Sequence, residues 1–166
     1  MRRTRALLLA ALLALTVSVP VSAATTFDVM AIVKENFERA PSDEPCVFDE
    51  VNETLTCPGQ GNAGRFGQLT SSAIYDGSLF VTRTLTFRDG STVTLLEEYG
   101  ETMFPGNSQN APGAMKSFGN PFSEAGTWEI IDATGSQAGT TGSGTVTAMG
   151  AGNTFQFWFS GTVTAP

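Results

Sequence analysis

The chain has 166 residues, with 9 basic and 16 acidic side chains and no histidine. Its length is that of one domain with a sizeable core. The missing histidine excludes Ser-His-Asp and Cys-His catalysis and histidine metal sites. The acidic balance argues against nucleic acid or an anionic membrane surface as a partner. We therefore expect no metal, no cofactor and no nucleic-acid partner.

The N-terminus reads as a targeting segment. Three arginines open the chain, an apolar run follows from Ala6 to Val19, and small residues lead up to Ala23. This order is typical of a secretory signal peptide at 1–23, which leaves a mature domain at 24–166. The alternative is an uncleaved membrane anchor, but the run is shorter than the roughly 20 residues that cross a bilayer. Without the three arginines the mature chain carries 6 basic and 16 acidic residues, a net charge of -10.

The two cysteines, Cys46 and Cys57, are predicted to form a disulfide. An exported protein reaches an extracellular or periplasmic compartment, where disulfides form and persist. Metal binding is the alternative, but two thiols without histidine make a poor site.

The first half of the mature chain gives mixed signals. Residues from Thr26 to Arg39 fit a helix or a strand, because their apolar positions suit both periods. The segment between the cysteines is expected to be a hairpin or loop. The glycines of Pro58 to Gly67 suit turns and bulges, and Gln68 to Tyr75 is expected to be a strand.

The second half reads more clearly as strands. Leu79 to Gly100 alternates apolar and polar residues on both sides of Asp89-Gly90, which is typical of a hairpin. Glu101 to Ser123 is expected to be a long loop, either a lid or a disordered surface segment. Gly126 to Met149 is predicted as strand, glycine-rich turn and strand, and Thr154 to Val163 as a final strand.

Seven to nine short strands with short turns predict an all-β antiparallel fold. The two architectures that fit are an eight-stranded antiparallel β-barrel, which we favour, and a β-sandwich.

Three segments resemble the allene oxide cyclase and dirigent barrel superfamily over roughly Gly59 to Val163. They are GNAGRFGQLT at 61–70, FRDGS at 87–91 and WEIIDATGSQAGTTG at 128–142. The last departs from the family signature at Asp132-Ala133, where two glycines are usual, and at Gln137, near a usual aromatic. The resemblance implies an eight-stranded barrel whose ligand cavity steers the cyclisation of a lipid epoxide or the coupling of phenolic radicals. It carries over no catalytic residue.

One constellation follows from the hairpin pattern. If the apolar faces match across the hairpin, Arg83 and Glu97 share the apolar face, directly opposite or diagonal. A buried charge is costly unless it is paired. We therefore interpret the two residues as either a ligand-binding pair in a lumen or a structural ion pair; with inverted faces they are surface charges. The predicted ligand-binding residues are Arg83, Glu97, Tyr99, Phe155, Phe157 and Phe159.

The sequence favours a secreted barrel protein that binds a small hydrophobic or amphipathic ligand in its lumen. The first alternative is an exported structural or interaction protein with a filled core. The second is a cyclase, isomerase or dirigent-type enzyme, and we expect the protein not to be an enzyme.

Overall fold

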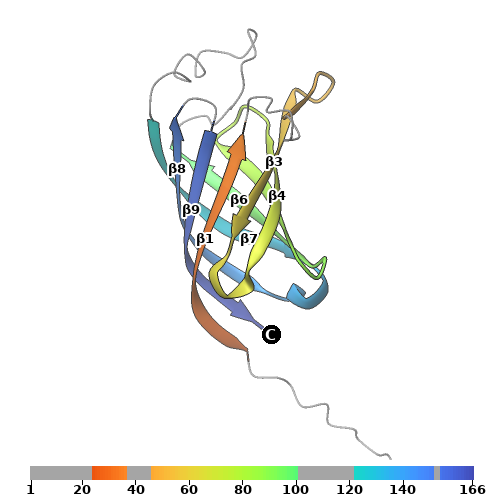
Figure 1. The fold of residues 1–166 in the computed structure, drawn as a ribbon, viewed down its shortest axis with the longest axis vertical. Coiled ribbons are helices and arrows are strands. Elements are labelled where there is room, and N and C mark those ends of the chain that lie inside the picture. The colour runs from red at the N-terminus through yellow and green to blue at the C-terminus, as the bar shows by residue number, and fades with distance from the viewer. Residues whose placement is uncertain (1–23, 37–45, 101–121, 152–153) are drawn as a thin grey trace, which may run out of the picture.

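The computed structural model describes residues 24–36, 46–100, 122–151 and 154–166. These residues are nearly all in strands, as Figure 1 shows, apart from two short 3-10 helices. The nine strands are β1 (Thr25–Asn36), β2 (Val47–Asp49), β3 (Thr54–Asn62), β4 (Gln68–Tyr75), β5 (Phe80–Phe87), β6 (Thr92–Tyr99), β7 (Phe122–Ala133), β8 (Thr141–Ala151) and β9 (Thr154–Ala165). The 3-10 helices are η1 (Gly64–Phe66) and η3 (Gly135–Gln137).

The sheet closes into a barrel. From β3 to β9 each strand pairs antiparallel with the next in sequence, and β1 completes the ring by pairing with both β9 and β3. Eight strands therefore form a closed antiparallel barrel, and β2 is an extra strand on β3. The predicted barrel is confirmed and the sandwich alternative is wrong, because a sandwich leaves sheet edges where β1 here joins both ends.

The first strand resolves the ambiguity near the N-terminus. Thr25–Asn36 is extended, and its inward positions Ala31, Val33 and Glu35 are buried while Met30 and Ile32 are exposed. The ring closes because β1 lies between β9 and β3 and pairs with both. An extended strand can do this because it presents backbone hydrogen-bonding groups along both of its edges. The remainder of the ambiguous segment, 37–39, lies outside the described residues.

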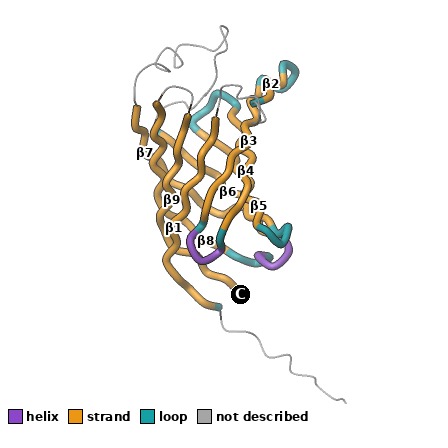
Figure 2. Tube along the Cα trace, viewed as in Figure 1, coloured by secondary structure: helices purple, strands orange, loops and turns teal. Residues whose placement is uncertain are grey.

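The two ends of the barrel differ. At one end, which we call the turn end, η1 joins β3 to β4, Asp89-Gly90 joins β5 to β6, and η3 joins β7 to β8 (Figure 2). Gly90 has φ 83°, a conformation that suits glycine in a tight turn. β1 ends and β9 begins at the opposite end. The predicted long loop lies outside the described residues except at Phe122 and Ser123, which begin β7 instead.

Several glycines predicted to form turns lie inside strands. Gly59 and Gly61 belong to β3, and Gly142 and Gly144 belong to β8. These strand positions are glycine because neighbouring groups come too close there for a side chain. Gly144 faces Gly161 on β9, and a Cβ on these glycines would lie 2.8 Å and 2.7 Å from the indole of Trp128. The small pair thus makes room for one large side chain.

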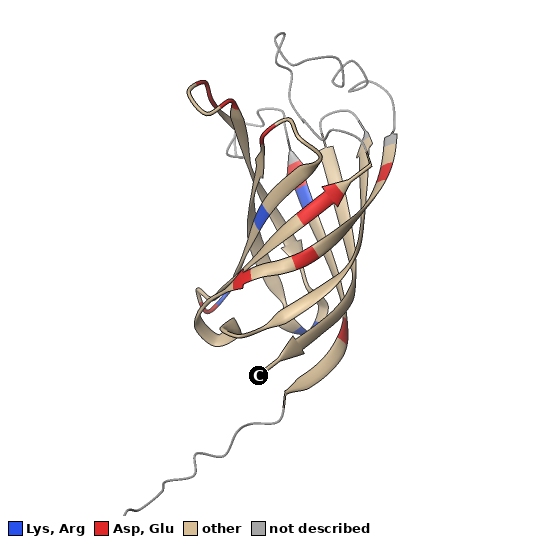
Figure 3. Cartoon of the chain, turned by 180° about the vertical axis from the view of Figure 1, so that it is seen from behind, with Lys and Arg blue, Asp and Glu red and all other residues tan. Residues whose placement is uncertain are grey.

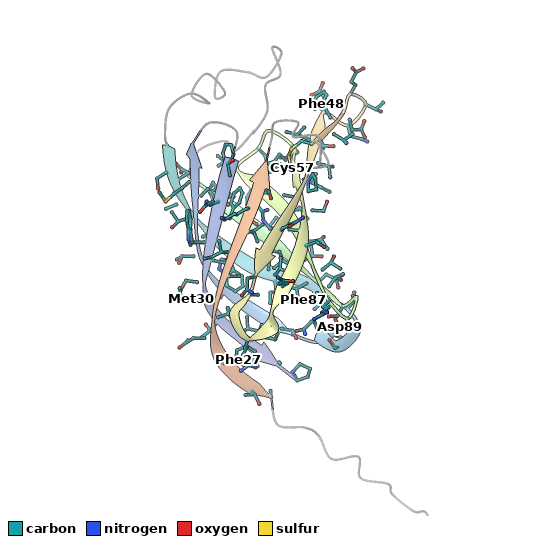
Figure 4. All side chains as sticks on the ribbon, in the orientation of Figure 1. Phe27, Met30, Phe48, Cys57, Phe87 and Asp89 are labelled. Atoms are coloured by element: carbon teal, nitrogen blue, oxygen red, sulfur yellow. A yellow bond between two sulfur atoms is a disulfide. The ribbon has the colours of Figure 1, made fainter. Side chains whose placement is uncertain are left out.

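Cys46 and Cys57 form the predicted disulfide. It ties the residue before β2 to β3, and the β2–β3 hairpin projects beyond the barrel, with Phe48 on the projecting part (Figure 4). The disulfide is consistent with an oxidising compartment, either extracellular or periplasmic.

Charged residues are unevenly spread over the strands. Figure 3 shows acidic positions on several strands and few basic ones. β8 and β9 carry no charged residue on either face.

Candidate functional site

Inside the barrel, five polar residues meet in the half away from the turn end. We call Glu35, Tyr75, Arg83, Glu97 and Tyr99 the charged cluster. They come from β1, β4, β5 and β6, and each points inward because it shares the parity of its strand's buried residues. Arg83, Glu97 and Tyr75 are 0% exposed, Glu35 is 1% exposed and Tyr99 is 2% exposed.

Arg83 lies between the two glutamates. Its Nη1 donates to Glu35 Oε1, and its Nε donates to Glu97 Oε1 at 2.5 Å. Its Nη2 reaches Glu97 Oε2 at 3.4 Å. The predicted diagonal placement is the observed one, since Arg83 pairs with Leu95 and Glu97 with Val81.

The two tyrosines satisfy the outer carboxylate oxygens. Tyr75 Oη donates to Glu35 Oε2 at 2.6 Å, and Tyr99 Oη donates to Glu97 Oε2 at 2.6 Å. Burial and the nearby Glu97 carboxylate raise the pKa of both tyrosines well above their ordinary value of 10.0. Both hydroxyls are therefore protonated donors at neutral pH.

The charged cluster contains one guanidinium and two carboxyl groups. If all three groups are ionised, the buried cluster carries one net negative charge. Arg83 is the only basic residue among the buried residues that the structure describes. An uncompensated charge in a dry interior is expensive, so the hydrogen bonds that Arg83, Tyr75 and Tyr99 donate to the two carboxylates are needed to stabilise the cluster.

Phenylalanines of β9 cover the guanidinium. Arg83 Cζ lies 4.1 Å from the ring centroid of Phe157 and 5.7 Å from that of Phe159. Phe155 stacks on Phe157 with the centroids 6.3 Å apart. The rings favour the cation through their negative faces and separate it from the rest of the lumen.

A second feature lies toward the turn end, on the other side of Phe159. It is an apolar cavity of about 60 Å³, which we call the turn-end cavity. Its lining residues are Val29, Ala31, Ala63, Phe66, Leu85, Phe87, Val93, Leu95, Trp128, Ile130, Gln137, Thr140, Phe159 and Val163. None of these side chains carries a charge.

Trp128 forms a fixed wall of this cavity. Its single Nε1–H is shared between the carbonyl oxygens of Thr145 and Ser160, at 3.1 Å and 3.3 Å from Nε1. With its N–H bonded and Gly144 and Gly161 against its ring, the indole is held in one orientation.

Thr140 and Gln137 are the polar residues of the lining, and both present apolar atoms to the cavity. Thr140 is 6% exposed, and its Oγ1 has no hydrogen-bond partner among the described residues. A buried hydroxyl without a partner loses its hydration and gains nothing in return. One other described side chain has this property, Ser71, which is absent from the cavity lining.

At the rim of the turn end, Asp89 ties two turns together. Ser136 Oγ donates to Asp89 Oδ2 and Ser91 Oγ to Asp89 Oδ1, both at 2.6 Å. These bonds lower the pKa of Asp89 to about 2. Ser136 belongs to η3, so the bond holds the turn that carries Gln137 against the β5–β6 turn.

All six residues predicted to bind a ligand lie in the lumen: Arg83, Glu97, Tyr99, Phe155, Phe157 and Phe159. Arg83 contacts Glu97, Phe157 and Phe159, Tyr99 contacts Glu97, and Phe155 contacts Phe157. Of the six, only Phe159 also lines the cavity. Their role in binding stays a prediction. Sequence reasoning missed Glu35 and Tyr75; the alternation Ala31, Val33, Glu35 would have indicated the first, had the segment been identified as a strand.

No family model, curated protein or solved structure matches the chain. The similarity to allene oxide cyclase and dirigent barrels therefore stays a prediction. The described part of the chain brings no three acidic or cysteine side chains together where they could hold a metal ion. Within that same part, no helix has the length and apolarity needed to cross a membrane.

Proposed function

We propose that this protein binds a small apolar molecule in the turn-end cavity. The observation that carries the proposal is the uncharged, aromatic lining around Trp128, Phe66 and Phe159. Small-molecule sites are typically concave, mostly apolar and supplied with a few polar groups. The turn-end cavity has the apolar surface of such a site, and its polar lining residues, Gln137 and Thr140, present apolar atoms to it.

The size of the cavity limits the ligand. One water needs about 10–15 Å³ of such volume, so about 60 Å³ holds roughly four to six water-sized groups. Drug-sized ligands occupy about 300–1,000 Å³. The occupant is therefore a compact molecule of a few non-hydrogen atoms, or the tip of an alkyl chain.

The charged cluster is not the primary site in this proposal. Arg83 already uses its Nε and Nη1 on carboxylates, and its faces lie against Phe157 and Phe159. A ligand carboxylate would have to displace Glu35 or Glu97, each of which would then be buried unpaired. We assign the cluster the role of a rigid support behind Phe159, which forms the inner wall of the cavity.

The direct test is a titration with the linear alcohols from 1-propanol to 1-hexanol. The chain has two tryptophans. Trp128 lines the cavity, whereas Trp158 of β9 lies on the opposite parity from the buried Phe157 and Phe159 and serves as an internal control. The indole N–H signals can be followed by ¹H–¹⁵N NMR and assigned with Trp158→Phe.

We expect a saturable shift of the Trp128 signal and none of the Trp158 signal. Each added methylene should tighten binding about fourfold, since burying one is worth about 0.8 kcal/mol, until the cavity is full. A saturable shift lost in Ala31→Val, which adds two methyl groups to the lining, would place the ligand in this cavity. Equal, linear drifts of both signals would contradict the proposal.

An exported interaction protein with a filled core is the second candidate. It is supported by the half of the lumen around Arg83, where aromatic and polar side chains pack against one another. Absence of saturable binding in the same titration would favour it. An enzyme of the cyclase or dirigent type has less support, because no titratable side chain among the described residues lines the cavity.

We further propose that the protein is exported and cleaved after Ala23. The support is the order of charged, apolar and small residues before that position, together with the disulfide. N-terminal sequencing of the protein from its native host should begin at Ala24. An intact N-terminus in the membrane fraction would contradict cleavage.

A further inference from the structure

Apolar side chains gather on the outside of the barrel over three neighbouring strands. β1, β9 and β8 lie side by side in the sheet (Figure 1), and neither β8 nor β9 carries a charged residue. On their outer side Met30 is 72% exposed, Ile32 and Met149 are also exposed, and Trp158 is partly exposed. We call the outward side chains of these strands the β1–β9–β8 face. Exposed apolar groups that cluster in this way mark interaction surfaces.

Two residues of opposite charge bound this face on β1. Asp28 and Lys34 point outward, three positions before and three positions after Ala31. Met30 and Ile32 lie one position on either side of the same residue. In the part of the chain that the structure describes, neither Asp28 nor Lys34 belongs to an ion pair. The outward pattern of β1 is therefore acidic, apolar, apolar and basic.

This pattern is complementary to itself. A two-fold axis that lies in the contact plane at Ala31, across the strands, runs the β1 strands of two copies antiparallel. Asp28 of one copy then faces the partner's Lys34. Met30 likewise faces the partner's Ile32, and each pair forms twice because both copies use the same patch. Parallel β1 strands would instead place Asp28 against the partner's Asp28, which is unfavourable.

The same axis sets large side chains against small ones on the neighbouring strands. Trp158 and Ser160 are the register partners of the two apolar residues of β1. The axis exchanges their rows, so Trp158 faces the partner's Ser160. On β8 it brings Met149 opposite the partner's Ser143. The two copies can therefore approach without a clash between bulky groups.

The charge of the protein favours a second copy as the occupant of this face. The chain has a formal net charge of -7, so two copies repel each other and a contact between acidic faces brings carboxylates together. The outward charges of β1, β8 and β9 are Asp28 and Lys34, which the antiparallel contact pairs with each other. This face thus lets two acidic barrels meet without like charges in contact.

We propose that two copies of the protein associate through the β1–β9–β8 face, with their β1 strands antiparallel across a two-fold axis. Neighbouring strands lie about 4.8 Å apart, so a face three strands wide makes a narrow contact. A narrow contact gives a weak, reversible dimer and not an obligate one. The inference concerns the outside of the barrel and is independent of the turn-end cavity.

The first test is sedimentation equilibrium of the disulfide-intact protein from about 10 µM to about 1 mM. Ile32→Ser removes an apolar side chain from the face. Ile74→Ser is the matched control, because Ile74 lies on β4 and is 41% exposed, against 40% for Ile32. We expect Ile32→Ser to weaken the dimer at least about tenfold, since the two-fold axis repeats the loss, and Ile74→Ser to leave it unchanged.

Two outcomes of this test would overturn the inference. One is a monomer at about 1 mM, whether the face is bare or covered by something else. The other is equal weakening by Ile32→Ser and Ile74→Ser, which would place the contact on another surface. Neither outcome would bear on binding in the turn-end cavity, which the alcohol titration tests separately.

A pair of charge variants tests the antiparallel arrangement. Asp28→Lys and Lys34→Glu each put like charges opposite one another in a homodimer, so each variant alone should dimerise about tenfold more weakly than wild type. Mixed in equal amounts, the two variants restore opposite charges at both places, and the mixture should dimerise about as well as wild type. Absence of any gain on mixing would overturn the proposed arrangement.

Discussion

The charge of the buried cluster can be changed one unit at a time. With Glu35, Arg83 and Glu97 ionised, the wild type carries one net negative charge, and all three side chains are at most 1% exposed. Glu35→Gln or Glu97→Gln brings the cluster to zero, the double glutamine variant gives one positive charge, and Arg83→Leu gives two negative charges. The series therefore separates the effect of net charge from that of any one contact.

Stability should be highest near zero net charge. In Glu35→Gln the carboxamide oxygen accepts from Arg83, and the amide group donates to the hydroxyl oxygen of Tyr75, so the contacts survive. We expect the free energy of unfolding to stay within about 1 kcal/mol of wild type or to rise. Arg83→Leu leaves two carboxylates buried without a cation and should lower it by about 3–5 kcal/mol. The double glutamine variant should lose a similar amount.

The assay is guanidinium chloride unfolding at pH 7 with the disulfide intact, followed by tryptophan fluorescence. Comparable slopes with denaturant concentration are needed before the free energies are compared. A loss in Glu35→Gln as large as that in Arg83→Leu would refute the reasoning, because the contacts and not the charge balance would then control stability. A free energy of unfolding that is nearly the same in all four variants, Arg83→Leu included, would show that the cluster is hydrated.

Three further predictions concern other parts of the barrel. Tyr75 and Tyr99 are the two tyrosines of the chain, and folding raises the pKa of both. Their contribution to the free energy of unfolding is therefore fully present below pH 10 and falls above it by up to about 1.4 kcal/mol per pH unit for each tyrosine. Absorbance at 295 nm should show both tyrosines ionising only as the barrel unfolds. Titration of either tyrosine near pH 10 in the folded protein would contradict their burial. The pKa of Asp89 is lowered to about 2, so its contribution is present above pH 3.8 and lost as the pH falls toward 2, and Asp89→Asn should remove that step from an acid-unfolding curve. Replacing Cys46 and Cys57 by alanine should lower the free energy of unfolding by about 2–4 kcal/mol. It should leave 1-butanol binding unchanged, because neither cysteine lines the cavity. A parallel loss of binding would contradict the independence of the disulfide and the turn-end cavity.

The sequence was most informative where the alternation of buried and exposed side chains can be followed within one strand or one hairpin. The alternation around Asp89-Gly90 predicted that Arg83 and Glu97 share one apolar face, and matching the apolar faces across the hairpin left two registers, of which the diagonal one is observed. Likewise, Phe155, Phe157 and Phe159 were correctly placed together on the buried face of the last strand.

Features that depend on distant strands could not be derived in this way. Glu35 lies 48 positions before Arg83, and the two meet only because β1 closes the ring between β9 and β3. The cavity depends on how the volumes of side chains from many strands add up, and no pattern within one strand reports that sum. The glycines of β8 were assigned to a turn because local chemistry does not reveal that Trp128 lies against them.

A crystal structure of the protein grown with 1-butanol tests the central claim most directly. We predict electron density for one molecule between Trp128 and Phe159, with its alkyl chain against both rings. Density only on the outer surface, or a lumen closed around Trp128 with no bound molecule at saturating 1-butanol, would contradict it.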